Sequence, residues 1–277
     1  MDLIIFLGVF AFSIFAGAFG ALMGLGGGLI IVPILAVIFG FDVKTAIAAS
    51  IVAVIATSCA GASVYCDRRQ VNIKLGIVLE TATAVGAITG ALLTAVLLPK
   101  KIIMAFFIGA LVYAAVYMAL RPERLIKPGR RKGRLCGSYT DDKTGKKVEY
   151  DVRHVKGGLI AGFFAGNMSG MLGVGGGLVQ VPVMNGWMRV PIKAAIATSN
   201  FMIGVTAVAS AYIYYTHDYF YPVLAAFVAA GVFFGARGGS LAASRFDAKR
   251  LRSLFIAVII IMAFLMMLRL IGVVNPI

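Results

Sequence analysis

Two glycine-rich stretches carry the residue pattern in this chain that is best suited to bind a ligand. GLGGGLIIVP runs from Gly24 to Pro33 and GVGGGLVQVP from Gly173 to Pro182, with seven of the ten positions identical. Glycine weakens a helix by roughly 1 kcal/mol per residue relative to alanine, so we predict that each stretch ends one helix and begins another. The first N–H groups of a helix lack partners and carry partial positive charge. Two such helix starts, free of side chains, can bind one anion through the backbone.

Polar side chains near these stretches are candidates to complete the site, because hydroxyl and amide groups hydrogen-bond the oxygens of an oxyanion. Their alternative role is to join helices through hydrogen bonds. Arg237 lies inside an apolar stretch, where its side chain either contacts the ligand or extends to the membrane surface. The candidate substrate-binding residues are Gly26, Gly27, Gly28, Gly175, Gly176, Gly177, Ser50, Asn167, Gln180, Ser199, Asn200 and Arg237.

Three more charged residues are candidates for a role in a transport pathway. Lys44 and Lys193 each begin a helical segment, where they either guide anions at opposite mouths of a pathway or anchor the helix at the interface. Glu80 is the only acid well inside an apolar stretch. We therefore consider it for proton coupling, with pairing to Lys74 or contact with solvent as the alternatives.

A nucleotide loop and close helix packing are two alternative roles for the glycines. A P-loop needs a lysine after the glycines, and the dinucleotide fingerprint needs glycine where Leu29 and Leu178 stand. Helix packing remains an alternative, and it suits GAITGA at 86–91 and GVFFGA at 231–236, whose glycines lie four residues apart.

The composition is that of a polytopic membrane protein. The chain has 277 residues, of which 61% are hydrophobic and only 13% charged, against about 25% charged in soluble domains. Its mean hydropathy is +0.96, and apolar runs long enough to span a bilayer recur along it. The net charge of +15 is concentrated, since twelve of the 26 Lys and Arg residues lie in segment 121–156. We expect the lipid bilayer as a partner, and no nucleic acid, metal or cofactor.

The sequence contains an internal repeat with an offset of 149 residues. KTAIAAS at 44–50 matches KAAIATS at 193–199, in addition to the match between the two glycine stretches. Repeats of this length are typical of transporters with pseudosymmetric halves. We expect transmembrane repeats at 1–120 and 157–277, separated by a cytoplasmic basic loop at 121–156.

Each repeat should contain five helical segments, so the second would enter the membrane from the opposite side. With the long loop inside, the inside has 21 Lys and Arg residues and the outside three, which places both termini outside. The predicted fold is therefore all-α with two inverted-topology repeats. The short segments at each glycine stretch form either full crossings or re-entrant hairpins. The predicted segments are 3–22, 25–39, 44–65, 75–98 and 102–120, then 157–172, 174–188, 193–215, 221–244 and 251–272.

The basic loop has a pattern of its own. Val148, Tyr150 and Val152 alternate, which favours a strand. We predict a small β-hairpin that turns near Asp142–Lys146, with Gly145 at positive φ. The alternative is a disordered linker.

These motifs resemble the sulfite exporter TauE/SafE family of membrane proteins. The resemblance rests on the duplicated G-[LV]-G-G-G-x-[VIL]-x-V-P motif, the K-x-A-x-A-[ST]-S segment and GARGGSLA at 235–242. It covers nearly the whole chain. It implies export of a small anion, such as sulfite or an organosulfonate like sulfoacetate, across the bacterial inner membrane.

We therefore expect a secondary transporter that exports a small anion by alternating access. An anion channel is the nearest alternative. An integral membrane enzyme fits less well, because the sequence offers no Ser/His/Asp set, metal cluster or nucleotide loop. We also expect that alanine at Gly27 or Gly176 would favour the helix by roughly 1 kcal/mol and leave a folded protein with little flux.

Overall fold

The computed structural model describes residues 3–120, 135–140, 145, 147–242 and 248–272. Almost all of them are helical. The first part of the chain contains α1 (Leu3–Met23), α2 (Gly28–Pro33), a π-helix (Ile34–Ile38), α3 (Val43–Asp67), α4 (Ile73–Leu92), a second π-helix (Leu93–Leu97) and α5 (Lys100–Leu120). The second part contains α6 (Val155–Leu172), α7 (Gly177–Gly186), α8 (Ile192–Thr216), α9 (Pro222–Ala242) and α10 (Ala248–Ile271).

The predicted helical segments are confirmed, apart from shifts at their ends. At the glycine stretches α2 and α7 begin three residues later than expected, at Gly28 and Gly177, and α10 begins three residues earlier, at Ala248. The helix α2 ends at Pro33, and the chain continues directly as the π-helix Ile34–Ile38. Among the described residues, six helices are long and apolar enough to cross a membrane.

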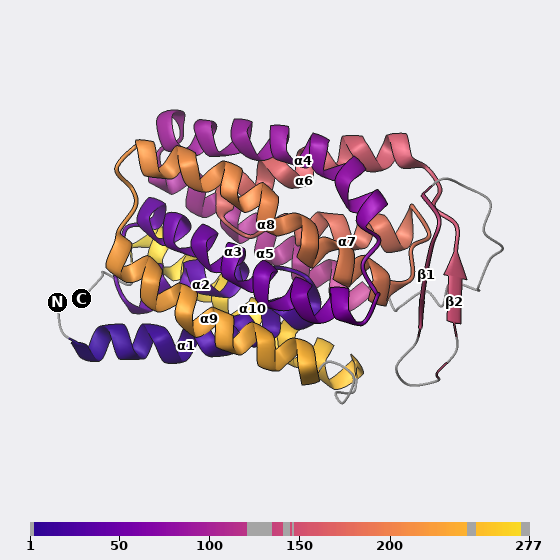
Figure 1. Ribbon diagram of the computed structural model, residues 1–277. Coiled ribbons are helices and arrows are strands. Elements are labelled where there is room, and N and C mark those ends of the chain that lie inside the picture. The colour runs from indigo at the N-terminus through magenta and orange to yellow at the C-terminus, as the bar shows by residue number, and fades with distance from the viewer. Residues whose placement is uncertain (1–2, 121–134, 141–144, 146, 243–247, 273–277) are drawn as a thin grey trace.

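The helices pack in matched pairs. The two long helices α3 and α8 contact each other in the middle of the bundle, α1 packs along α9, and α4 packs along α6 (Figure 1). The fifth helices, α5 and α10, also contact each other. The first helix of each half therefore packs against the fourth helix of the other half.

Small residues explain why these pairs approach so closely. A Cβ added at Gly86 or Gly90 on α4 would overlap backbone atoms of α6, and one added at Gly235 would overlap the Ile14 carbonyl on α1. Glycines four residues apart line one face of a helix and let a second backbone come into contact. The packing role predicted for GAITGA and GVFFGA is confirmed.

Each glycine stretch folds its two helices back as a hairpin. The Phe39 ring lies against Gly8 near the start of α1 and edge-on to Phe12, with 6.1 Å between ring centroids. The second half repeats the arrangement, since Trp187 after α7 contacts Gly157 near the start of α6. In both halves the second helix returns to the end where the first began, as the re-entrant hairpin and the two full crossings both require.

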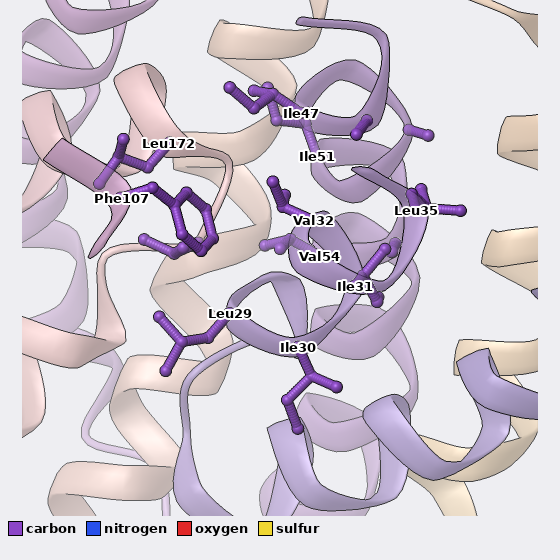
Figure 2. Packing of buried hydrophobic residues seen from close by; sticks show 14 of the residues in the cluster. Leu29, Ile30, Ile31, Val32, Leu35, Ile47, Ile51, Val54, Phe107 and Leu172 are labelled. Carbon is purple, nitrogen blue, oxygen red and sulfur yellow. The ribbon is translucent and has the colours of Figure 1, made fainter. Parts of the chain in front are cut away.

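The short helix α2 is stabilised by burial. All six of its residues are buried, although so short a helix is marginal in isolation. Figure 2 shows Leu29, Ile30 and Val32 among side chains from α3, α5 and α6. Inside a membrane such packing stabilises a helix through van der Waals contacts.

The loop between the halves contains the predicted β-hairpin. β1 (Gly137–Thr140) pairs antiparallel with β2 (Lys147–Tyr150). Gly145 has the expected positive φ of 64°, while 141–144 and 146 in the predicted turn lie outside the described residues. The two strands lie at one end of the bundle, opposite the start of α1 (Figure 1).

The hairpin is docked on the helices. Tyr139 and Tyr150 are buried in a cluster with Leu75 of α4 and with Met188, which follows α7. The side-chain amide of Asn72, the cap of α4, donates to the Leu135 carbonyl at 3.0 Å. Burial raises the pKa of the Tyr150 phenol to about 12. The phenol is therefore neutral in its docked position at physiological pH.

Candidate functional site

The first break lies between α1 and α2. The chain leaves α1 at Met23 and starts α2 at Gly28, with Gly27 as the cap residue at φ 76°. The Gly27 carbonyl accepts hydrogen bonds from the amides of Ile30 and Ile31, at 3.0 and 3.2 Å. This left-handed backbone conformation is easy for glycine and strained for any residue that carries a Cβ.

The second break repeats this geometry between α6 and α7. Gly176 caps α7 at φ 67°, and its carbonyl accepts from the amides of Val179 and Gln180, both at 3.1 Å. The predicted interruptions are thus confirmed, but the expectation that alanine would favour the helix is wrong. The expected loss of flux stays a prediction. At positive φ a methyl group does not favour the helix, and it strains the backbone by roughly 1–2 kcal/mol.

The two breaks meet at a buried crossing. A Cβ at Gly28 would overlap the carbonyl oxygen of Gly173, and one at Gly177 would overlap the carbonyl oxygen of Gly24. The first residue of each short helix therefore rests on the first glycine of the other stretch. We call this contact region the glycine crossing, and its core consists of Gly24, Gly28, Gly173 and Gly177.

Two serines reinforce the crossing in the same reciprocal way. The Ser50 hydroxyl on α3 donates to the Gly173 carbonyl at 2.9 Å, and the Ser199 hydroxyl on α8 donates to the Gly24 carbonyl at 3.0 Å. Both serines are fully buried. The structure thus places Ser50 and Ser199 beside the glycine stretches, and in this state their hydroxyls hold backbone carbonyls.

Each short helix begins with an unpaired amide. The N–H groups of Leu29 and Leu178 donate to no acceptor among the described residues. Both amides are the second in their helix, where no intrahelical carbonyl can reach them. The sequence predicts anion donors at Gly26–Gly28 and Gly175–Gly177, and these two amides follow directly after those glycines in opposite halves of the chain.

The second break is the more polar of the two. Gln180 on α7 is 3% exposed, and neither its Nε2 nor its Oε1 atom has a hydrogen-bond partner among the residues that the structure describes. Its Nε2 lies 3.6 Å from the Cβ position at Gly176. The residue at the matching repeat position is Ile31. A buried amide without partners is destabilising by about 1–3 kcal/mol, so Gln180 is a candidate ligand contact.

Asn200 is the second polar group of this kind. Its Nδ2 atom donates to the carbonyls of Ala21 and Ile196, at 3.2 and 3.1 Å, while its buried Oδ1 atom accepts no hydrogen bond within the described part of the chain. The matching repeat position holds Ile51. Asn200 thus reaches from α8 to the end of α1, next to the first break.

Two predicted site residues lie apart from the crossing. Asn167 is half-buried on α6, and its amide donates to the Thr89 hydroxyl of α4 at 3.1 Å. Arg237 is exposed on the outer surface of α9, whereas the glycines of the crossing are buried. Asn167 faces α4 because α6 packs on that helix. Arg237 is exposed because α9 packs against α1 through its glycine face.

Lys44 is buried more deeply than a pathway-mouth residue was expected to be. It is 8% exposed, and its ammonium donates to the Ala95 carbonyl at 3.1 Å and to the Tyr219 hydroxyl at 3.3 Å. The ammonium also lies 5.0 Å from the centre of the Tyr219 ring. Its repeat partner Lys193 is half-buried. The two lysines therefore have different surroundings.

A pair of tyrosines was missed from the sequence. The Tyr65 hydroxyl donates to the Ala21 carbonyl at 3.1 Å, and the Tyr214 hydroxyl donates to the Gly170 carbonyl at 3.0 Å. These carbonyls occupy matching places near the ends of α1 and α6. The repeat could have revealed them, because Tyr65 and Tyr214 occupy matching positions, 149 residues apart. In the described part of the chain, no three His, Cys, Asp or Glu side chains cluster in a way that could hold a metal ion.

Comparisons with known proteins agree with this architecture. The profile of the family described as Sulfite exporter TauE/SafE matches residues 9–266. The chain is 27% identical over 235 residues to Probable membrane transporter protein YunE of Bacillus subtilis (strain 168), which covers 82% of this chain and 85% of the relative. It is 24% identical over 266 residues to Probable membrane transporter protein MJ0441 of Methanocaldococcus jannaschii, covering 91% of both chains.

No solved structure matches the chain significantly. The family match spans both glycine stretches and every candidate residue, and the relatives are named as membrane transporters. The broken helices, the paired halves and the apolar spans have the form expected of such a protein. The chain belongs to the Sulfite exporter TauE/SafE family and is a multi-pass membrane transporter.

Proposed function

We propose that this transporter exports a small oxyanion, sulfite or an organosulfonate such as sulfoacetate, by alternating access across the bacterial inner membrane. The observation that carries the proposal is the glycine crossing. Two helix starts that are 149 residues apart in the sequence meet there, and their reciprocal contacts are buried. Paired broken helices at matching places in two halves are the best pointer to a transport site.

The groups around the crossing suit an oxyanion. The unpaired N–H groups of Leu29 and Leu178 offer backbone donors, and the Gln180 amide offers a side-chain donor that now has no partner. Anions bind at helix starts because the N–H groups point at the ligand and the helix dipole favours negative charge. The buried ammonium of Lys44 adds positive charge in the same bundle.

The mechanism we propose depends on inverted repeats. The first helix of each half packs on the fourth helix of the other half, and the two serine bonds are exchanged between halves. This pattern supports a twofold relation between residues 1–120 and 157–277. The glycine contacts leave no space for an anion between Gly28 and Gly173. The two hairpins must therefore separate to admit substrate, and the arrangement described here corresponds to a closed state.

The orientation is the first part of the proposal to test. The excess of positive charge in 121–156 supports a cytoplasmic hairpin, and the start of α1 lies at the opposite end of the bundle (Figure 1). In a cysteine-free background, Lys101→Cys should react with a membrane-impermeant maleimide on intact cells. Lys147→Cys should react only after permeabilisation. The reverse result would contradict the proposed orientation.

Flux measurements test the proposed substrate. Purified protein in liposomes should exchange sulfite with saturation, and the panel should include sulfoacetate, thiosulfate, sulfate and carboxylates. Protein-free liposomes provide the control for leakage. A flux that rises linearly with concentration would indicate a channel instead. Monodisperse protein that moves none of these anions would overturn the proposal.

A further inference from the structure

A carboxylate inside the helix bundle lies away from the glycine crossing. Glu80 lies on α4 where that helix packs against α8, about two turns after the helix begins at Ile73. Its Oε1 atom accepts a hydrogen bond from the Thr206 hydroxyl of α8 at 2.6 Å. Its Oε2 atom accepts one from the Thr83 hydroxyl of α4 at 3.1 Å. The side chain is thus held at both oxygens by neutral groups.

No cation neutralises Glu80 within the part of the chain that the structure describes. The ion pairs there join Lys100 to Asp42 and Lys147 to Glu149. Of the basic residues on the helices around Glu80, Lys74 is exposed in the first turn of α4 and Lys156 is exposed at the start of α6. Lys193 lies at the beginning of α8, thirteen residues before Thr206. The pairing of Glu80 with Lys74 that the sequence left open is not formed.

Two hydroxyl partners suit a group that changes its protonation state. A hydroxyl donates to a carboxylate, and it can also rotate to accept the proton of a carboxylic acid. A lone charge inside a membrane span is unfavourable, and such residues commonly mark proton relays. Glu80 can therefore bind and release a proton without losing its two contacts.

Thr206 and its counterpart in the first repeat donate to different kinds of acceptor. Its counterpart in the first half is Thr57, whose hydroxyl donates to the Gly26 carbonyl of the first break at 3.1 Å. Thr206 instead donates to Glu80. The carbonyl that matches Gly26 is that of Gly175, and it accepts from the Gly177 amide at 2.8 Å. In the first half Thr57 is thus hydrogen-bonded to the glycine break, whereas in the second half Thr206 is hydrogen-bonded to Glu80.

Thr206 is also linked to the crossing along α8. Ser199 lies seven residues earlier, two turns along one face of the helix, and donates to the Gly24 carbonyl. A change in the contact between Glu80 and Thr206 would therefore act on the helix that holds the crossing closed.

We propose that Glu80 is the proton-binding site that couples anion export to a proton gradient, with Thr206 relaying its state to the crossing through α8. This inference rests on the proposed function, because a coupled proton requires a transported anion. Thr206 is a positioning residue in this scheme, and Glu80 carries the proton.

The test uses sulfite as the probe in liposomes that contain wild type, Glu80→Gln, Glu80→Asp, Thr206→Val or the control Thr81→Val. Thr81 is exposed on α4 and donates only to Val78 of its own helix. Two modes are compared. The first is exchange of labelled sulfite at equal pH, and the second is sulfite transport driven by a pH gradient, with proton movement followed by an internal pH dye.

Glu80→Gln should keep sulfite exchange and lose both proton movement and the response to the gradient. Glu80→Asp should retain proton movement. Thr206→Val should shift the pH of half-maximal coupling upwards by about one pH unit, because the charged carboxylate loses a hydrogen bond. Thr81→Val should match wild type in both modes.

The outcomes separate the two proposals. If wild type exchanges no sulfite, the proposed function fails, and the inference fails with it. If wild type exchanges sulfite but moves no protons, or if Glu80→Gln still moves them, the inference fails while the proposed function stands. Should Glu80→Gln not fold, an unchanged pH dependence in Thr206→Val and Glu80→Asp would also overturn the inference.

Discussion

The two glycine breaks have the same backbone and different surroundings. Gly27 and Gly176 cap their helices at φ 76° and 67°, and each short helix rests on the other stretch. Around the first break the matching positions are Ile31 and Ile51, whereas around the second they are Gln180 and Asn200. The shared backbone maintains the crossing, and the differing side chains make one side of it suitable for polar recognition.

This difference shows how a duplicated fold can become specialised. The glycine contacts and the serine bonds need both halves, so a change in either glycine stretch affects the whole crossing. Gln180 and Asn200 are under no such constraint, because the first half has apolar residues at those positions. The unpaired Nε2 atom of Gln180 is the donor on which our proposal of an anion contact in the second half rests, since isoleucine serves packing at the matching position of the first half.

Disruption of the glycine crossing, which both halves form, should have the largest effect on stability. Gly28→Ala and Gly177→Ala should each lower stability by about 1–3 kcal/mol or more, because the methyl group overlaps a carbonyl of the opposite stretch. Thermal unfolding of detergent-solubilised protein measures this. Gly109→Ala is the matched control, since that position on α5 is exposed and has nothing within 4 Å. Equal melting temperatures for Gly28→Ala and the control would show that the crossing does not stabilise the protein.

Exchanging the side chains at positions 31 and 180 tests the difference in polarity between the two breaks. Gln180→Ile should raise stability by about 1–3 kcal/mol, because a buried amide without partners is removed, and it should reduce sulfite exchange. Ile31→Gln should lower stability by a similar amount. Unfolding curves and liposome exchange of the same preparations measure both effects. A gain in stability with unchanged exchange would make Gln180 a structural residue only.

The smallest expected effect concerns the two serines. Ser50→Ala and Ser199→Ala should each cost about 0.5–1.5 kcal/mol, the usual contribution of one hydrogen bond. Because both act on the same crossing, the double variant should depart from the sum of the single effects by about 0.5 kcal/mol or more. Ser63→Ala is the control, as its hydroxyl donates within its own helix to Ala60. Strict additivity would mean that the two bonds stabilise separate parts of the bundle.

Sequence patterns are sufficient to predict the helices and the places where they break. Hydrophobic runs, repeat offset and glycine content are local properties, and they were enough to predict the helices, the breaks and the small hairpin with Gly145 at positive φ. The packing role of GAITGA and GVFFGA was also readable, because spacing within one helix fixes which residues share a face.

Tertiary packing selects which of these elements come into direct contact. Contact between Gly28 and Gly173 joins residues that are far apart in the chain, and no local pattern specifies such a contact. The same packing turned Asn167 towards α4, left Arg237 exposed, and paired Glu80 with Thr206. The effect of alanine at Gly27 was mispredicted because helix propensity applies to helical φ and ψ, whereas the fold holds this residue at φ 76°. Side-chain type and spacing identify candidates for a site, but the directions in which the helices face one another select among them.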